Sequence, residues 1–441
     1  MNTPALYEIF QKHPKICTDS RKAESGSLFF ALKGDNFDGN KYAELALEKC
    51  AFAIVDDPLV VKNDKYILVD DTLLKLQSLA KYHRKRLGLP IIAITGTNGK
   101  TTTKELIAGV MAMKYKVGYT LGNLNNHIGV PLTLLSFNCE HEFGIVEMGA
   151  NHIGEIAALC KIAAPDYGLI TNVGKAHLDG FGSFEGVKKA KGELYNYLYE
   201  NDGVAFVNYD NEQLEDMKPP HSVIYYGTNR FTHCQGRIEE NGPFLSIRWI
   251  GSEDSANEHE VVEWLQEGKL IKTKLYGNYN FENVLAAVCI GNNFNVDDEQ
   301  IKLAIEGYTP KNNRSQLLQT ENNTLIVDSY NANPTSMKAA LDNFNQVKLD
   351  NKMILLGDMF ELGEVSIREH GVIIALLKEL KFEHVILVGN NFYFYSDNTE
   401  FVFKKDIEEL MVYLVEKKIS GRNILIKGSR GLHLEDTIKY L

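Results

Sequence analysis

The segment IIAITGTNGKTTTKEL (residues 91–106) constrains this chain most strongly, because it predicts a strand, a glycine loop and a helix in direct succession. The continuous apolar run IIAIT is what a buried parallel strand requires. Gly96 and Gly99 then permit a tight loop whose backbone N–H groups point inward, and the following helix adds the positive end of its dipole. This combination predicts a binding site for the phosphates of a nucleotide.

Two side chains of the loop have the chemistry that a nucleoside triphosphate needs. Lys100 can neutralise charge on the β- and γ-phosphates, and the hydroxyl of Thr101 can bind Mg²⁺. The general phosphate-loop motif begins with a glycine where this chain has Ile94. A tight strand-to-helix turn without a ligand is the alternative, and the Gly-Lys-Thr sequence at the helix start disfavours it. The expected ATP-binding loop consists of Gly96, Thr97, Asn98, Gly99, Lys100, Thr101 and Thr102.

The order of apolar and amphipathic segments predicts an α/β chain with three domains. Residues 1–85 contain short strand-like runs and helical stretches, which predict a small α/β N-terminal domain. Residues 86–311 alternate buried strands with helices, which predicts a central P-loop ATPase domain with a mostly parallel sheet; within it, residues 222–276 are expected to form antiparallel edge strands. The alternation restarts in residues 312–441, which predicts a Rossmann-like C-terminal domain.

Composition and charge narrow the class of function. The 441 residues are 44% hydrophobic and 24% charged, which provides for several globular cores. The formal net charge of -11 argues against general nucleic-acid binding. The six cysteines form no Cys-x-x-Cys pair, no apolar run is long enough to span a bilayer, and no basic-then-apolar leader opens the chain. We therefore expect a cytoplasmic enzyme, and a monomer, with neither nucleic acid nor membrane as a partner.

Several polar residues stand where the chemistry of a phosphate site could use them. Glu147 ends the run FGIVEM and His177 follows YGLITNV, so both are expected at the sheet edge where ligands bind open α/β sheets. A carboxylate there can hold Mg²⁺, although a strand-end Glu or a lone His is often only structural. Asp328, at the end of a strand, suits a ribose hydroxyl. Taken alone, Lys191 reads as a solvated lysine and Arg314 as an exposed linker residue.

The motifs ITGTNGKTTT, VEMGAN, TNVGKAHLDGF, AKGELY, GNYNFENVLAA and DSYNANPTSM occur in this order, and the chain resembles the Mur ligases of bacterial cell-wall synthesis. The resemblance runs from Asp19 to about Gly431. The segment TDSRKAESGSLFFALKGDNFDGNKYA is similar to the first domain of the later ligases, which holds a UDP-sugar. GDMFELGE, together with DSYNANPTSM, resembles the last ligase of the series, and the sequence contains no DNPR-type motif of the preceding one.

The resemblance also implies roles for individual residues. The implied catalytic residues are Lys100, Lys191, His177 and Glu147. The implied ligands of two Mg²⁺ ions are Thr101, Glu147, His177 and Lys191, the last of these as a carbamate. Further implied contacts to ATP are Asn283, Arg314 and Asp328. The implied substrate-binding residues are Thr18, Asp19, Ser20, Arg21, Asn123, Asn125, Asn126 and Asn331.

The activity implied by the resemblance is ATP-dependent amide ligation. D-alanyl-D-alanine would be joined to UDP-N-acetylmuramoyl-tripeptide through an acyl phosphate. A ligase that adds the third stem residue is the alternative within the family. A folylpolyglutamate-type or cyanophycin-type ligase would lack the DSRK…GSLFFALKG segment. A P-loop NTPase that couples hydrolysis to movement would need no peptide substrate.

Overall fold

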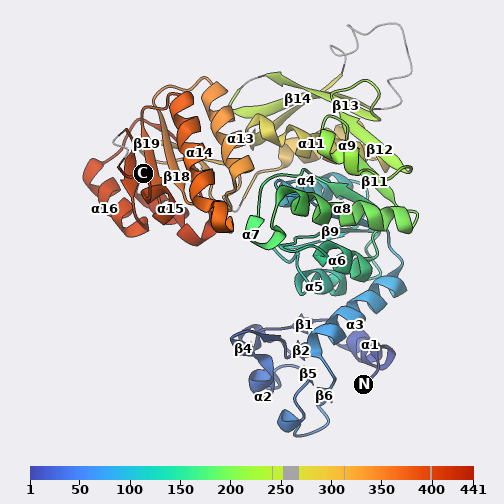
Figure 1. Cartoon of the computed structure of the whole chain (residues 1–441). Coiled ribbons are helices and arrows are strands. Elements are labelled where there is room, and N and C mark those ends of the chain that lie inside the picture. The colour runs from blue at the N-terminus through green and yellow to red at the C-terminus, as the bar shows by residue number, and fades with distance from the viewer. Residues whose placement is uncertain (241, 252–267, 312, 398–399) are drawn as a thin grey trace.

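The structure is a computed structural model that describes residues 1–240, 242–251, 268–311, 313–397 and 400–441. Three large sheets, each with its own helices, form three units in chain order (Figure 1). The N-terminal unit lies at the bottom of the view, the central unit above it, and the C-terminal unit beside the central one. The expected α/β chain with three domains is confirmed, while the expected boundary between residues 311 and 312 involves a residue outside those described.

The N-terminal unit is a parallel four-stranded sheet in the order β1-β2-β5-β6, with a separate small hairpin of β3 and β4. Its strands are β1 (Ile16–Cys17), β2 (Leu28–Phe30), β3 (Lys33–Gly34), β4 (Phe37–Asp38), β5 (Phe52–Val55) and β6 (Tyr66–Leu68). Its helices are α1 (Thr3–Lys12), α2 (Ala43–Ala46) and α3 (Thr72–Leu87), and its 3₁₀ turns are η1 (Ser20–Lys22), η2 (Gly39–Tyr42) and η3 (Pro58–Val60).

The central unit is a nine-stranded sheet in the order β15-β14-β13-β12-β11-β10-β7-β9-β8. Its strands are β7 (Ile91–Thr95), β8 (Val117–Tyr119), β9 (Phe143–Glu147), β10 (Tyr167–Ile170), β11 (Val204–Asn208), β12 (Val223–Gly227), β13 (Cys234–Glu240), β14 (Phe244–Gly251) and β15 (Lys269–Tyr276). Its helices are α4 (Lys100–Met111), α5 (Gly129–Ser136), α6 (Glu155–Ala163), α7 (Leu178–Phe181), α8 (Phe184–Glu200), α9 (Glu212–Met217), α11 (Phe281–Asn293) and α12 (Asp298–Gly307), with the 3₁₀ turn η5 (Asn278–Asn280).

Strand β7 shows how this sheet is covered on both faces. Ile91 and Ala93 belong to the core that includes residues of α5, α6 and α8, whereas Ile92 and Ile94 belong to the core that includes α4 and α11. This alternation follows from the two-residue period of a strand. The expected antiparallel edge is confirmed for β13–β15, but β12 is parallel to β11, contrary to expectation, because helix α9 lies between them and returns the chain in the same direction.

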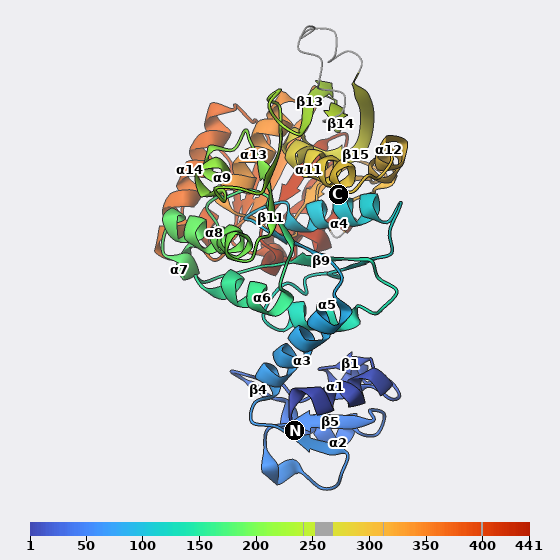
Figure 2. The same ribbon diagram turned by 90° about the vertical axis from the view of Figure 1, so that its right-hand side faces the viewer.

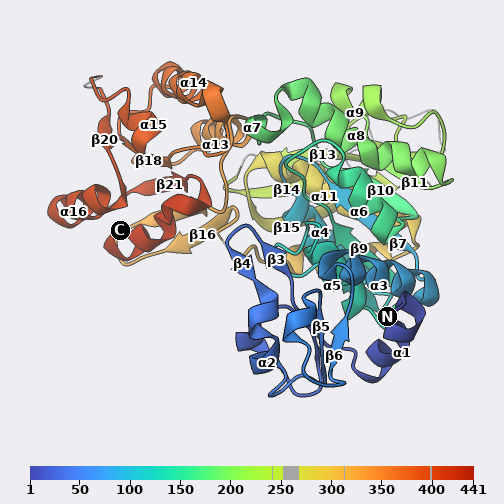
Figure 3. The ribbon, with the colours of Figure 1, turned by 60° about the horizontal axis from the view of Figure 1, so that its bottom comes forward.

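Helix α3 joins the N-terminal unit to the central one. Asp71 caps the start of the helix, because its carboxylate accepts the N–H of Leu74 at 2.8 Å, and Gly88, with a φ of 65°, caps its end. It packs against α5 and α6 of the central unit, as Figures 2 and 3 show from two sides. A single apolar core therefore runs from the first sheet through α3 into the central unit.

The C-terminal unit is a six-stranded sheet in the order β16-β17-β21-β18-β19-β20, parallel except for β16. Its strands are β16 (Gln316–Gln319), β17 (Thr324–Asp328), β18 (Lys352–Gly357), β19 (Val385–Val388), β20 (Val402–Lys404) and β21 (Asn423–Lys427). Its helices are α13 (Pro334–Gln346), α14 (Ser366–Glu379), α15 (Asn390–Tyr393) and α16 (Ile407–Lys417), and its 3₁₀ turns are η6 (Gly363–Val365), η7 (Arg430–Leu432) and η8 (Leu434–Tyr440). Helices α13 and α14 cover one face, and α16 covers the other.

The attachment of α3 depends on Arg84, and we expect Arg84→Ala to destabilise the chain. The buried guanidinium donates to the carbonyls of Ala163 and Ala164, both at 2.9 Å, and to the carboxylate of Asp166 at 2.8 Å. Loss of these partners should cost about 1–3 kcal/mol of unfolding free energy, measured in urea. Lys85→Ala, on the exposed side of the same turn, is the matched control. Equal stability of the two variants would contradict the role of Arg84.

Candidate active site

The phosphate loop connects β7 to α4, and its glycines are required by their surroundings. Gly96 has a φ of 138° and Gly99 a φ of 78°. A Cβ at Gly96 would lie 2.0 Å from the hydroxyl oxygen of Thr171, and a Cβ at Gly99 would lie 2.5 Å from the side-chain oxygen of Asn283. Larger residues are therefore excluded by both backbone conformation and space.

The segment that leaves β10 holds the loop in place. The N–H of Thr97 donates to the backbone carbonyl of Asn172 at 2.9 Å, and the N–H of Asn98 donates to the Asn172 side chain at 2.9 Å. The hydroxyl of Thr171 donates to the carbonyl of Asn98 at 2.6 Å. These three bonds fix the loop, and the first N–H groups of α4, with the helix dipole behind them, are suited to bind an anion.

Lys100 and Thr101 are at the start of α4, as the sequence predicted. The ammonium of Lys100 donates to the carbonyls of Gly96 and Thr97 at 2.8 and 3.0 Å. Burial lowers the pKa of Lys100, against the opposing attraction of Glu147, and Arg314 lowers it further. The negative charge of an anion bound at the loop would favour the protonated form of Lys100 and so raise its pKa again.

Glu147 has the environment of a cation ligand. It is 1% exposed at the carboxyl end of β9; its Oε1 accepts from the Thr101 hydroxyl at 3.2 Å and from the Asn125 amide at 2.8 Å. Its Oε2 is buried without a hydrogen-bond partner, and the ammonium of Lys104 lies 3.9 Å from it. A buried carboxylate oxygen beside a threonine hydroxyl fits the oxygen ligands of Mg²⁺. Across the described residues, no group of three or more His, Cys, Asp and Glu side chains could hold a metal by itself.

Lys191 and His177 both lie near the ring of Phe181. Lys191 is 2% exposed in α8, with its ammonium 5.3 Å from the ring centre of Phe181. Burial lowers the pKa of Lys191 to about 7, and Lys100 lowers it further. His177 precedes α7 in a left-handed conformation, with a φ of 50°, and its Nδ1 lies 2.5 Å from a carboxylate oxygen of Glu361 in the C-terminal unit. The reading of Lys191 as a solvated lysine is therefore wrong.

The side chains expected to contact the nucleotide are distributed over both units. Asn283 is buried, accepts from the Thr103 hydroxyl at 3.0 Å and donates to Asn280 at 3.0 Å. Asp328 ends β17 and accepts from the ammonium of Lys427 at 2.6 Å. Arg314 lies over the ring of Tyr330, 3.5 Å from its centre, and its charge lowers the pKa values of Lys100 and Lys104. Asn283 is thus packed against the loop and Arg314 acts on its lysine from the C-terminal unit, while the partners of Asp328 lie within that unit.

The expected substrate-binding residues lie in three separate places. Thr18, Asp19, Ser20 and Arg21 form a turn after β1, where Arg21 pairs with Asp19 at 2.8 Å and this hydrogen bond lowers the pKa of Asp19 to about 2. Asn123 is exposed, Asn125 binds Glu147, and Asn126 accepts the N–H groups of Ile128 and Gly129. Asn331 is exposed after β17, and its carbonyl accepts from Lys427 at 3.3 Å.

The central and C-terminal units meet at the phosphate loop through residues that the sequence analysis did not single out. The amide of Asn333 donates to the side-chain oxygen of Asn98 at 2.7 Å. The N–H of Lys175 donates to Thr335 at 3.0 Å, and its ammonium pairs with the buried Glu369 at 3.0 Å. Asn333 and Thr335 belong to the DSYNANPTSM motif, so the motif was the one sequence feature that could have pointed to these two residues.

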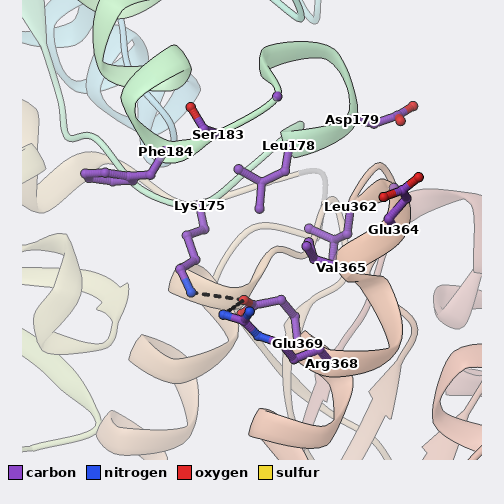
Figure 4. A pocket seen from close by; sticks show the side chains of 12 residues that line it. Lys175, Leu178, Asp179, Ser183, Phe184, Leu362, Glu364, Val365, Arg368 and Glu369 are labelled. Carbon is purple, nitrogen blue, oxygen red and sulfur yellow. Dashed lines mark hydrogen bonds and ion pairs between the residues drawn. The ribbon is translucent and has the colours of Figure 1, made fainter.

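A cavity of about 390 Å³ lies at this junction, between residues 175–184 and residues 362–369 (Figure 4). The pair of Lys175 and Glu369 lies at one side of it, with Arg368 next to Glu369. Leu178, Leu362 and Val365 supply apolar side chains to its wall. The cavity therefore offers both apolar and charged groups beside the segment that carries His177.

Comparisons with known proteins place this site in a family. The model of the Mur ligase middle domain matches residues 94–291, and the model of the Mur ligase glutamate ligase domain matches residues 313–430. The UDP-N-acetylmuramoyl-tripeptide–D-alanyl-D-alanine ligase of Bacillus subtilis is 35% identical over 438 residues, 97% of this chain and 92% of the relative. The chain belongs to the Mur ligase family. The resemblance inferred from the motifs is thereby confirmed.

Other relatives and solved structures agree with this. The enzyme of the same name from Escherichia coli is 32% identical, covering 97% of this chain and 93% of the relative. The structure of MurF from Acinetobacter baumannii has a TM-score of 0.86 and 30% identity, covering 99% of this chain and 98% of that one. MurF from Thermotoga maritima in complex with ADP has the same fold, with a TM-score of 0.83 at 24% identity, covering 97% of each chain. This Mur ligase is an ATP-dependent enzyme, and no helix among its described residues is long and apolar enough to cross a membrane.

Gly99→Ala should remove most nucleotide binding from this Mur ligase. The new Cβ would meet Asn283 at 2.5 Å, at a φ of 78° that alanine rarely adopts, so the loop must shift. We expect the affinity for ADP, measured by titration calorimetry, to fall at least about 10-fold, the equivalent of 1.4 kcal/mol. Gly109→Ala, later in α4 and with nothing within 4 Å of its Cβ, is the control and should keep full affinity. Unchanged ADP binding in Gly99→Ala would refute this account of the loop.

Proposed function

We propose that this Mur ligase joins D-alanyl-D-alanine to UDP-N-acetylmuramoyl-tripeptide and converts one ATP to ADP and phosphate. The observation that carries the proposal is the convergence of Lys100, Thr101 and Glu147 on one phosphate loop. This loop is in a chain that matches ligases of that name over 97% of its length. A motor or switch of the P-loop class has no need for the N-terminal unit that these relatives share.

The reaction proceeds in two balanced steps. The terminal carboxylate of the tripeptide attacks the γ-phosphorus of ATP, and the bond to ADP breaks to give an acyl phosphate. The amine of D-alanyl-D-alanine then attacks the acyl carbon, and the tetrahedral intermediate loses phosphate and a proton to give the amide. Lys100 and the N–H groups at the start of α4 stabilise the charge that develops on the transferred phosphoryl group.

Thr101 and Glu147 would hold one Mg²⁺ ion, and His177 with a modified Lys191 would hold a second. Magnesium supplies neutralisation of the phosphate charges and of the developing oxyanion. The Oε2 of Glu147 supports the first assignment, because it is buried, has no hydrogen-bond partner and would gain one ligand bond from the ion. The position of His177 beside the ring of Phe181, over which Lys191 lies, supports the second.

Lys191 has the properties that a carbamate requires. Its pKa of about 7 leaves a substantial fraction of neutral amine near neutral pH, and only the neutral amine attacks CO₂. The new N–C bond forms with loss of one proton and leaves an anion. The modification thus replaces a buried cation that Lys100 repels by an anion that Lys100 attracts.

The remaining residues take substrate-positioning roles in this proposal. Asn283, Arg314 and Asp328 contact the nucleotide with Gly96, Thr97, Asn98, Gly99 and Thr102. The UDP-sugar meets Thr18, Asp19, Ser20 and Arg21, and the peptide meets Asn123, Asn125, Asn126 and Asn331. The corresponding domains are residues 1–85, 86–311 and 312–441. We place the enzyme in the cytoplasm, where its six free cysteines stay reduced.

An ADP-release assay tests the proposed substrates. Release should require both UDP-N-acetylmuramoyl-tripeptide and D-alanyl-D-alanine, and a single amino acid should not replace the dipeptide. Lys100→Ala should lower kcat by at least about 100-fold, since it removes stabilisation of the transition state, while Lys161→Ala on exposed α6 surface should not. ADP release without any peptide substrate would overturn the proposal in favour of an NTPase. Equal release with a single amino acid would favour the ligase that adds the third residue.

The carbamate makes a separate prediction for Lys191. Lys191→Ala should lose at least about 100-fold in kcat and regain part of it with small carboxylates, because these supply the missing anion. In the unchanged enzyme at limiting bicarbonate, activity should fall as the pH drops below about 7, since the amine becomes protonated. Lys189→Ala, exposed on the same helix, is the control. Absence of any carboxylate rescue, together with a bicarbonate-independent rate, would contradict the modification.

A further inference from the structure

The loop that follows β18 reaches out of the C-terminal unit to the segment that carries His177. Three residues with left-handed backbone come together there: His177 with a φ of 50°, Glu361 with 62° and Gly363 with 57°. Left-handed conformations cost energy in residues other than glycine, so they persist only where surrounding contacts enforce them. Two such residues from different units therefore mark this meeting point as a defined contact.

The contact is made by both side chains and backbone. The Nδ1 atom of His177 lies 2.5 Å from Oε2 of Glu361, and the hydrogen bond from His177 lowers the pKa of Glu361. The N–H of Asp179 points to the carbonyl of Glu361 at 3.5 Å. A Cβ at Gly363 would lie 2.9 Å from the carboxylate of Asp179, so the close approach depends on glycine at this position.

Buried groups of the C-terminal unit fix the first residues of this loop, directly after β18. The carboxylate of Asp358 is 2% exposed and accepts the N–H groups of Asn391 and Phe392 at 2.9 and 3.0 Å. The next residue, Met359, donates its N–H to Nε2 of the buried His370 at 3.0 Å. Glu361 therefore projects from a fixed backbone, and its place at His177 depends on how the two units are docked.

His177 directs its Nδ1 atom at Glu361, so its Nε2 atom is the one that could bind a ligand. A histidine that binds a metal commonly donates its second ring N–H to a carboxylate, which fixes the tautomer and the ring orientation and makes the ligand nitrogen more basic. The bond from Nδ1 to Glu361 has this form and leaves Nε2 as the ligand atom. The carboxylate differs from an ordinary supporting group in coming from another unit of the chain.

We propose that Glu361 is the positioning residue for His177, so that the second cation site is complete only when the C-terminal unit is docked. The inference rests on the proposed role of His177 as a cation ligand. Its consequence is reciprocal: docking strengthens cation binding, and a bound cation strengthens docking by the same factor. Closure of the two units and assembly of the cation site are then one event.

The test measures Mn²⁺ binding, in place of Mg²⁺, to the full chain with saturating ADP and bicarbonate, by electron paramagnetic resonance. Glu361→Ala removes the carboxylate, Glu361→Gln keeps an oxygen that accepts from Nδ1, and Glu364→Ala is the matched control in the same exposed loop. The unchanged chain should bind two Mn²⁺ ions. In Glu361→Ala the dissociation constant of one site should rise about 10–100-fold, while the other site stays unchanged.

The variants separate the possible outcomes. An intermediate loss in Glu361→Gln and unchanged binding in Glu364→Ala support the positioning role. Two Mn²⁺ sites in Glu361→Ala with the affinities of the Glu364→Ala control would overturn it and leave the proposed ligase function standing. Equal weakening of both sites would indicate general damage to the fold, which also overturns the specific role. A single Mn²⁺ site in the unchanged chain would refute the His177 site itself and this inference with it.

Discussion

The rest of the site depends on a group of lysines around the phosphate loop. Lys100, Lys104 and Lys191 are gathered near the phosphate loop, and burial lowers the pKa of each. Glu147 opposes this effect at Lys100 and Lys104, Glu105 also opposes it at Lys104, and Glu155 and Glu193 oppose it at Lys191. Burying a cation is costly, and the phosphates of a nucleotide would reduce that cost at this site. The chain as a whole carries a formal net charge of -11, so attraction of an anion to this loop has to come from these local groups.

The three units differ in how they are connected to the region of the phosphate loop. The central sheet supplies the loop and the residues that follow β9 and β10, because the carboxyl ends of parallel strands share one edge. The C-terminal unit reaches the same place through the polar residues Asn333 and Thr335, at the start of α13, and Glu361, in the loop after β18. The N-terminal unit is joined to the central one by a continuous apolar core. The junction with the C-terminal unit adds apolar contacts to these polar ones, because Tyr276 and Leu178 of the central unit pack with the apolar core of the C-terminal unit.

The parts of the site that the sequence revealed are those set by local pattern. The strand, glycines and helix of the phosphate loop are adjacent in the chain, so the sequence of residues 91–106 was enough to predict this local structure. Glu147 and His177 were placed correctly at the sheet edge, since strand direction follows from the alternation of strands and helices. The direction of β12 was not predicted, because strand pairing is decided by a connection whose helix, α9, is only one short element.

Other features depend on contacts that no local pattern encodes. Lys191 has the sequence context of a solvated helix face, KKAKGELY, yet its side chain is buried against Phe181. The bond between Asn98 and Asn333 spans 235 positions, and loop residues follow no period from which it could be anticipated. Lys104 was detectable in principle, because it follows Lys100 by one helical turn and therefore lies on the same side of α4 as the loop lysine. The family resemblance supplied roles for such residues, whereas their partners required coordinates.

The connection made by α3 also bears on the order in which this protein takes shape as it is synthesised. The partners of Arg84, at and just after the end of α6, are synthesised 79, 80 and 82 residues after it. Until then the inner side of α3 has no α5 or α6 to cover it, and the core of the N-terminal unit ends at an open apolar surface. Domains of most multidomain chains fold one after another from the N-terminus. In this chain the first unit instead acquires its final surface only when much of the second has been made.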